Sequence, residues 1–435
     1  MNRIEKWFSE LKKKGNAAPL CPVLQIPDEK DEWLRIWQGE PSWKGEAHGH
    51  GLNLGAAICG ELAMLCTAEM RVTFSGGERA EYLKGRTERF LPRLRAALSG
   101  ACGCGGVMLK PFLAGNGLGV EVVLPDRYLI TSADAEGEAT GCCFFDVTVQ
   151  EGKRYLRTEE HRMLEGKKYR VTNRAFLLEN GSVGKEVSLG EVKKWKDLEK
   201  TVTADGIAFP LFAHLSLPDL RGGARGRAVY ADAVGLLRDA DLQYDRLLWE
   251  FEGGELAIDA SSDAFLPDAE GRPSLPAGKD RLYRVNGLDA GYESGELMKV
   301  FSPALRDRSL IGGLNRVLMF VEDAAGIARG TFSDPSEVAR TATEVRAMKQ
   351  RTYATVCAIR VQLEKTLRGL FHAMEELCSL YRLCPEGGVT VGIAFGDGVL
   401  GADEEERVQD RLDFEAGLLS KEEYRRKWHP EGEEK

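Results

Sequence analysis

The sequence predicts an α+β protein in which a strand-rich region precedes a series of long helices. Short β-branched and aromatic segments recur between residues 107 and 178, and apolar residues recur at steps of three and four from residue 230 onward. With 435 residues, 43% of them hydrophobic, the chain is long enough for two or three modules with a buried core.

The charge balance argues against a protein that grips nucleic acid tightly. The chain carries 59 basic and 68 acidic residues, a formal net charge of −9. Proteins that hold DNA by its phosphates normally present a basic surface, because lysine and arginine replace the counterions that DNA releases. If this chain meets DNA, like-charge repulsion along most of the contact suits transit better than tight binding.

The chain carries no pattern typical of a secreted or membrane-spanning protein. Residues 1–8 mix charged and aromatic side chains and do not predict a signal peptide. The longest apolar run, residues 52–66, is interrupted by Asn53 and Glu61 and is shorter than the ~18–20 apolar residues that cross a bilayer. We therefore expect synthesis in a cytoplasm and no membrane span.

The cysteines and histidines do not predict a metal site. Cys102 and Cys104 are separated by one residue, and Cys142 and Cys143 are adjacent, so neither pair has the C-x2-C spacing of a zinc site. We expect reduced, mostly buried thiols. The pair formed by His48 and His50 could chelate a metal, but no third ligand stands nearby, so a solvent-exposed turn is favoured.

Helices are predicted in the first hundred residues and strands in the next eighty. Apolar residues recur at helical spacing over 52–70 and 81–98. Four glycines between residues 100 and 106 could suggest a phosphate loop, but no Gly-Lys-Ser/Thr sequence follows them. Gly166 can adopt a positive φ in a hairpin connection over 164–168. The predicted strands span residues 107–112, 119–124, 128–131, 142–149, 154–161 and 168–178.

The segment between the strands and the later helices has fewer regular features. Residues 191–202 predict a short helix with a solvated basic face. Residues 221–227 (RGGARGR) predict a flexible basic loop. Phosphate contact and a loop without a specific ligand both remain open interpretations of this loop.

Two amphipathic helices follow, separated by an insertion. Residues 230–252 carry an apolar stripe, and Gly253 and Gly254 end it. The insertion, residues 255–302, is rich in Gly, Pro and Asp. A second helix is predicted from 303 to 327, on the order of 35 Å long at ~1.5 Å per residue. The strands predicted in the insertion span residues 281–285 and 297–301.

The chain then breaks and continues into its longest helix. Residues 328–334 place Gly330 between two strong helical patterns, so we expect local mobility there. Asp334 can cap the next helix, with Pro335 in its first turn. Apolar residues recur at helical spacing as far as Tyr381. A strand over 389–395 and an acidic tail with one more amphipathic helix complete the chain.

Four segments resemble portal proteins, the head-to-tail connectors of tailed bacteriophages, of the siphophage type from Gram-positive hosts. Residues 239–250 (DADLQYDRLLWE) resemble the stem helix of that family. Residues 395–397 and 416–421 resemble the C-terminal end of its members. A further motif, placed shortly after residues 330–332, resembles the start of the family's long helix beyond the tunnel loop. It consists of Thr341, Ala342, Thr343, Glu344 and Val345. The match in order covers roughly residues 52–427, and the N-terminal third is similar only in pattern.

The resemblance implies a portal fold with a β-rich wing, paired long stem helices, a small α/β clip insertion and a long wing helix. Because the chain ends soon after its acidic helix, we expect a reduced crown. The implied segments are residues 1–228 (N-terminal wing region), 229–254 (first stem helix), 255–302 (clip), 303–327 (second stem helix), 328–335 (tunnel loop), 336–401 (long helix and C-terminal wing strand) and 402–435 (short acidic segment).

It also implies a structural function without catalytic residues, metal or cofactor. The family forms a dodecameric ring at one capsid vertex, through which DNA of any sequence passes during packaging and ejection. The implied partners are double-stranded DNA, the terminase large subunit, a head–tail adaptor, and the scaffolding and major capsid proteins. The implied location is the virion, after assembly of a phage or prophage product in the bacterial cytoplasm.

Two sets of residues are the candidate site. The acidic side chains of the first stem helix could line the channel, although solvated exterior charges are an equally good account. They are Asp232, Asp239, Asp241, Asp245, Glu250 and Glu252. The tunnel-loop residues implied by the resemblance are Arg329, Gly330, Thr331, Phe332, Ser333 and Asp334.

The alternatives are a different virion protein, such as a minor head or adaptor protein, and a hydrolase or metalloenzyme. No HExxH, Gly-x-Ser-x-Gly or Walker motif occurs, and the 6 histidines are scattered. Glu159, Glu160 and His161 could contribute a general base, but a surface charge cluster explains them as well. The order helix, insertion, helix, loop, long helix favours the portal.

Overall fold

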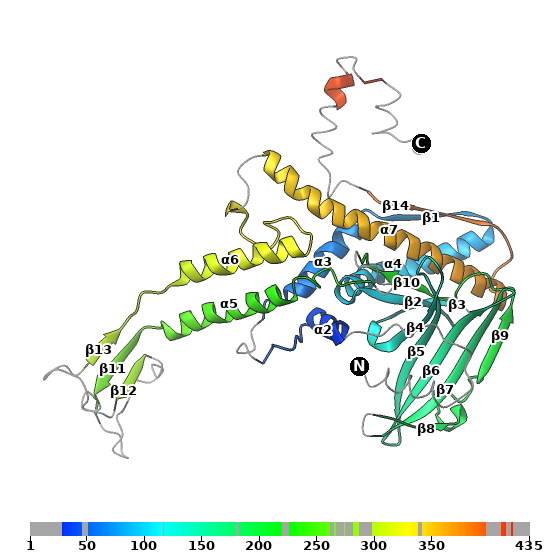
Figure 1. Ribbon diagram of the computed structural model, residues 1–435, viewed down its shortest axis with the longest axis horizontal. Coiled ribbons are helices and arrows are strands. Elements are labelled where there is room, and N and C mark those ends of the chain that lie inside the picture. The colour runs from blue at the N-terminus through cyan, green and yellow to red at the C-terminus, as the bar shows by residue number, and fades with distance from the viewer. Residues whose placement is uncertain are drawn as a thin grey trace.

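The computed structural model describes residues 28–45, 51–115, 117–179, 182–219, 226–261, 265–266, 274, 282–286, 298–337, 342–396, 410–414 and 419–420. Helices and mainly antiparallel sheets occupy separate stretches of the chain, which confirms the α+β class (Figure 1). Within these residues, no helix combines the length and the apolar character that crossing a bilayer requires.

Four helices build the main core. They form because apolar residues recur on one side of each, and these sides face one another in the core. The predicted second helix is longer than expected at both ends, and it stops where Gly105 adopts the left-handed conformation (φ 83°). The helices are α2 (Asp28–Trp37), α3 (Leu54–Thr67), α4 (Glu78–Cys104) and α7 (Ala342–Tyr381).

The largest sheet has the strand order β4-β5-β6-β7-β8, with β9 also paired to β7. Antiparallel pairing brings Leu164 opposite Lys168, and Gly166 has φ 74°, which confirms the predicted hairpin connection. The strands are β4 (Tyr128–Ala133), β5 (Ala139–Gln150), β6 (Lys153–Leu164), β7 (Lys168–Glu179), β8 (Ser182–Val187) and β9 (Thr201–Asp205).

Two smaller sheets connect the strand region to the helices. One has the order β10-β2-β3 and packs against α4 and α7. The other pairs β1 with β14, so that residues 71–76 lie beside residues 389–394 from the far end of the chain. The strands are β1 (Arg71–Gly76), β2 (Gly106–Ala114), β3 (Gly117–Val123), β10 (Ala213–Ser216) and β14 (Val389–Ala394).

The helix predicted over 191–202 is wrong. A 3-10 turn, η2 (Leu189–Glu191), begins at a capping box formed by Ser188 and Glu191, and turns then lead into β9. Val192 and Trp195 are fully buried against the sheet, and the Trp195 indole Nε1 donates to Asp146 at 3.0 Å. These two buried side chains hold the segment in a compact turn. Their spacing of three residues is also typical of a helix, which is why the sequence predicts one there.

Helices α5 (Val234–Gly253) and α6 (Asp307–Ala324) run side by side away from the rest of the molecule (Figure 1). A three-stranded sheet of order β12-β11-β13 lies at their far end, made of β11 (Ala257–Ser261), β12 (Tyr283–Asn286) and β13 (Met298–Phe301). β12 and β13 match the predicted strands, whereas β11 was not predicted. β11 pairs with β12 in parallel and with β13 antiparallel.

Both projecting helices begin later than predicted. Residues 229–233 form turns, because Tyr230 is fully buried with its hydroxyl 2.8 Å from the Trp33 carbonyl and 2.9 Å from the Gly103 carbonyl. The second helix starts at Asp307 instead of 303, because the Arg306 N–H donates to Glu250 at the end of α5. Its 18 residues therefore span about 27 Å, which is shorter than predicted.

Helix α7 offers a test of the core with a matched control. Leu363 is fully buried and Val361, two residues earlier, is 64% exposed. We expect Leu363→Ala to lower the free energy of unfolding by about 2–5 kcal/mol, because it leaves a cavity. Val361→Ala should change it by no more than about 0.5 kcal/mol. Urea unfolding followed by circular dichroism measures both, and equal effects would contradict this placement of the core.

Candidate functional site: the projecting helices and the loop after them

The pair formed by α5 and α6 buries little apolar surface of its own. Trp249 is 58% exposed, Ile311 48% and Phe320 44%. Large apolar side chains exposed together on one projecting element are a feature of many protein interaction surfaces. The pair is therefore a candidate interaction surface along its length.

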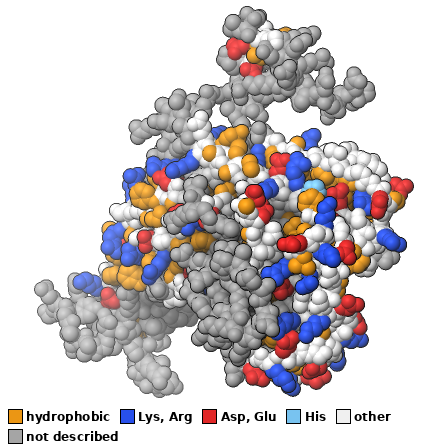
Figure 2. Space-filling view, turned by 45° about the vertical axis from the view of Figure 1, so that its right-hand side comes forward, with side chains coloured by type: hydrophobic (Ala, Val, Ile, Leu, Met, Phe, Trp, Pro, Cys, Tyr) orange, Lys and Arg blue, Asp and Glu red, His pale blue; other side chains and the backbone are white. Residues whose placement is uncertain are grey.

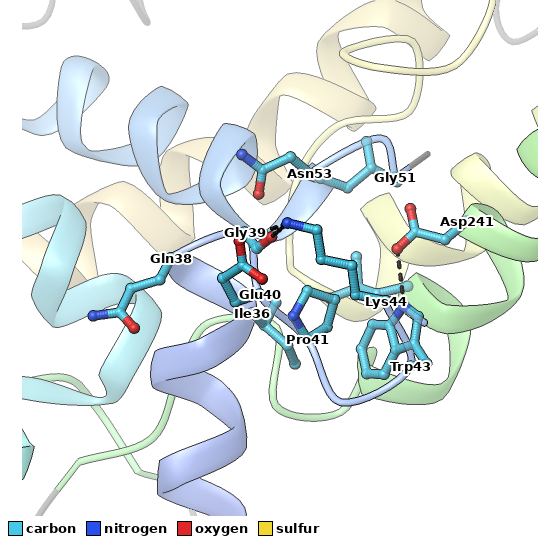
Figure 3. A pocket seen from close by; sticks show the side chains of 13 residues that line it. Ile36, Gln38, Gly39, Glu40, Pro41, Trp43, Lys44, Gly51, Asn53 and Asp241 are labelled. Carbon is cyan, nitrogen blue, oxygen red and sulfur yellow. Dashed lines mark hydrogen bonds and ion pairs between the residues drawn. The ribbon is translucent and has the colours of Figure 1, made fainter. Parts of the chain in front are cut away.

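Asp241, one of the predicted channel carboxylates, is buried at the base of α5. Its Oδ2 accepts from the Trp43 indole at 2.9 Å, and its Oδ1 accepts from the Leu52 backbone N–H at 2.8 Å. Figure 3 shows Asp241 and Trp43 on one side of a cavity of about 350 Å³, with Lys44 and Asn53 across it. Asp241 is thus an internal anchor of the protomer that ties residues 43–52 to α5.

Glu250 is also buried and joins the two projecting helices at their far end. Its carboxylate accepts from the backbone N–H of Arg306 at 2.9 Å and from the guanidinium Nη2 at 2.6 Å. These hydrogen bonds from Arg306 lower the pKa of Glu250 from its ordinary value of 4.5 to about 2. Glu250 therefore fixes where α6 starts and is not free to face a channel.

The other four predicted carboxylates are at least partly accessible. Asp239 and Glu252 are exposed, Asp245 is half-buried, and Asp232 is exposed while paired with Arg227. The structure thus divides the predicted set into two internal anchors and four surface acids.

The loop over 328–334 folds back along α6. The side chain of Glu322, fully buried on the last turns of α6, accepts from the backbone N–H groups of Gly330 and Ser333 at 3.2 and 3.0 Å and from that of Phe332. It also accepts from the Ser333 hydroxyl at 2.7 Å. Glu322 was not among the predicted residues, although an acid inside an apolar helical stripe was the available indication.

The outer side of the same loop carries an ion-pair network. Asp323 binds Arg329 from the loop at 2.6 Å and Arg351 from α7 at 2.7 Å. The hydrogen bond from Arg329, with the charges of both arginines, lowers the pKa of Asp323. Arg329, Thr331 and Asp334 are exposed, whereas Ser333 is buried and Phe332 partly so. Asp334 caps the 3-10 turn Pro335–Glu337 by accepting from the Ser336 N–H at 2.8 Å, whereas the long helix that it was predicted to cap, α7, is described from Ala342.

The side chains of the family motif are not among those that the structure describes. Thr341 lies outside the described residues, and Ala342, Thr343, Glu344 and Val345 lie in α7 without described side chains. His48, His50 and residues 221–225 also lie outside the described residues.

The acid–histidine cluster of the large sheet is an internal network rather than a surface cluster. Glu159 binds His161 Nε2 at 2.8 Å and Lys110 at 2.7 Å, and His161 Nδ1 lies 2.9 Å from the Tyr169 hydroxyl. Burial lowers the pKa of His161, which outweighs the opposing effect of Glu159. Burial raises the pKa of Glu159, but its hydrogen bond with His161 and the charges of Lys110 and Arg157 bring it below its ordinary range. Both imidazole nitrogens are engaged, so neither is available as a general base.

The cysteines predicted to be buried are buried. Cys102, Cys104, Cys142 and Cys143 are free thiols in the interior. Burial raises the pKa of Cys102, Cys142 and Cys143 well above its ordinary value, so these thiols stay protonated and are poor ligands. Among the described residues, no three His, Cys, Asp or Glu side chains gather as a metal site would require.

The face drawn in Figure 2 carries lysine and arginine interspersed with aspartate and glutamate, with apolar side chains among them. A continuous basic track, which phosphate binding requires, is not visible on this face. The distribution agrees with the acidic balance of the sequence.

No protein-family model and no characterised protein matches the sequence. Similar solved structures include a chain from the neck of an empty gene transfer agent particle computed with C6 symmetry (TM-score 0.49, 11% identity, 94% of this chain and 95% of that chain). A second comes from the virion of a native gene transfer agent particle (0.48, 11%, 97% and 97%), and a third from the neck of a native particle computed with C12 symmetry (0.46, 12%, 93% and 94%). At TM-scores below 0.5 these likenesses do not establish a function.

The Glu250–Arg306 contact predicts a specific acid response. Because the pKa of Glu250 falls from 4.5 to about 2 on folding, its contribution to stability is present above pH 4.5 and is lost as the pH falls toward 2. We expect Glu250→Gln to flatten the decline of the unfolding midpoint within this window. The control is Glu252→Gln, at an exposed position on α5. Its unfolding midpoint should decline with falling pH as that of the wild type does. Urea midpoints between pH about 2.5 and about 6 measure this, and identical slopes for both variants would refute it.

Proposed function

We propose that this chain is a portal subunit of a tailed phage or prophage. Copies would form a ring, twelve in our proposal, around a channel through which double-stranded DNA enters and leaves the capsid. In this proposal the β-rich region and α7 are the wing, α5 and α6 are the stem, and the β11–β13 sheet belongs to the clip that docks the terminase and then the head–tail adaptor. The single observation that carries it is the projecting helix pair with its uncovered apolar side chains.

The exposed apolar residues favour assembly from many copies. Trp249, Ile311 and Phe320 lie on a rod that extends away from the core, and each is more than two fifths exposed. A ring places identical rods side by side, so each copy covers the apolar side chains of the next. A minor head or adaptor protein could also assemble, but the described helix pair ending in a small sheet gives the stem-and-clip order that the sequence motifs favour.

The polar residues support a channel that does not hold DNA. The acids that remain accessible, Asp239, Asp245 and Glu252, would repel phosphates along the stem. Arg329, Thr331 and Asp334 are the exposed loop residues that we propose to meet passing DNA. Catalytic chemistry is not part of the proposal, and the motor that consumes ATP would be a separate protein.

Ring formation is directly testable. We expect mass photometry of the purified chain to show particles of about twelve times the 48.0 kDa of one chain, and negative-stain images to show an annulus with a central hole. Only monomers at micromolar concentration, or compact particles without a lumen, would overturn the proposal.

A substitution on the stem tests the surface that carries the proposal. We expect Ile311→Asp to abolish the rings while retaining the circular dichroism of the fold, because a carboxylate buried at each contact costs about 2 kcal/mol or more. Val149→Asp, at a 65% exposed position on β5, is the matched control and should still form rings. Intact rings with Ile311→Asp would remove the stem from the interface.

A further inference from the structure

The connection between α6 and α7 is organised around one carboxylate. Glu322 is fully buried, and all four of its hydrogen-bond donors come from residues 330–333. Among the described residues no lysine or arginine forms an ion pair with it. A buried carboxylate with no ion-pair partner depends on such donors, because leaving it unsatisfied in the interior costs the full desolvation penalty of a charge. Opening this loop would strand that charge.

Further contacts hold the loop on either side of the carboxylate. The Asp334 N–H donates to the side-chain oxygen of Asn315 at 2.6 Å. Asn315 lies two turns before Glu322 on α6. Gly330 has φ 87°, a left-handed conformation that suits glycine, and this directs its N–H to both Glu322 and the Ser333 hydroxyl. The glycine that predicts a mobile break in the sequence instead permits a tight fold-back.

The same block is bonded to α7. The Ala328 N–H donates to the Thr352 hydroxyl at 2.8 Å, and the Thr355 hydroxyl donates to the Gly326 carbonyl at 2.8 Å. Asp323 adds an ion pair to Arg351, which lies one turn before Thr355 on α7. The end of α6, the loop and residues 351–355 of α7 therefore share one continuous set of hydrogen bonds.

We propose that Glu322 is a positioning residue that clasps residues 328–334 into a rigid connector between α6 and α7. In this inference the connector moves with the two helices and not independently of them. It also presents Arg329 and Thr331 outward at a fixed position. The inference rests on the geometry of the protomer and stands whether or not rings form.

Residue-resolved amide hydrogen exchange of the full chain tests the clasp. In the wild type we expect the amides of Phe332, Ser333 and Asp334 to exchange at least about tenfold more slowly than that of Thr331, for which no hydrogen bond from its N–H is described. Glu322→Gln should accelerate exchange at Phe332 and Ser333 by roughly tenfold to hundredfold, because the amide group offers one acceptor in place of two charged oxygens.

The control is Glu252→Gln, which should leave exchange in the loop unchanged. If Glu322→Gln does not fold, Ser333→Ala removes one donor and should give a smaller acceleration confined to the loop. Wild-type amides as fast as Thr331, or equal exchange in the Glu322 and Glu252 variants, would overturn the clasp. Mass photometry of the same samples separates the two proposals: protected amides without rings would refute the portal function alone.

Discussion

The positions of the projecting helices depend on three buried carboxylates that accept hydrogen bonds, most of them from main-chain N–H groups. Two of these carboxylates form no ion pair among the described residues, and the third also binds an arginine side chain. Asp241 accepts from Trp43 and Leu52, Glu250 from Arg306, and Glu322 from the loop after α6. Asp241 and Glu322 each join a helix of the projecting pair to a segment outside it, and Glu250 joins the end of α5 to the residue that precedes α6. Since an unsatisfied buried charge is far costlier than an unmade exposed contact, these three side chains fix where the segments lie.

The parts of the fold that depend on local pattern could be predicted from the sequence. β5, β6 and β7 contain the strands predicted over 142–149, 154–161 and 168–178, and the hairpin at Gly166 follows from backbone freedom at that residue. The unpredicted strands β1, β8, β9, β10 and β11 are short and depend on partners elsewhere. β1, for example, pairs with β14 more than 300 residues away. Short strands of this kind are stabilised by their neighbours more than by their own residues, so periodicity does not reveal them.

The candidate site shows a similar division. The sequence identified the acids of the first projecting helix but treated them as one set, because charge alone does not distinguish a solvated carboxylate from a buried anchor. Asp239 and Asp241 are two residues apart and have opposite surroundings. What separates them is the indole of Trp43, brought there by a segment nearly 200 residues earlier. Glu322 was overlooked for the same reason, since its donors lie beyond the helix that carries it.

These anchors also explain how a rod with uncovered apolar side chains can keep its shape before it has a partner. Glu250 holds the far end of the pair, and Asp241 and Glu322 hold its base, so the geometry of the rod does not depend on Trp249, Ile311 or Phe320 being buried. Those side chains are then free to be covered by association. A surface that is already rigid loses less conformational entropy on binding than one that must fold first. Polar anchoring inside the protomer is therefore compatible with the apolar contact between copies that we propose for this pair.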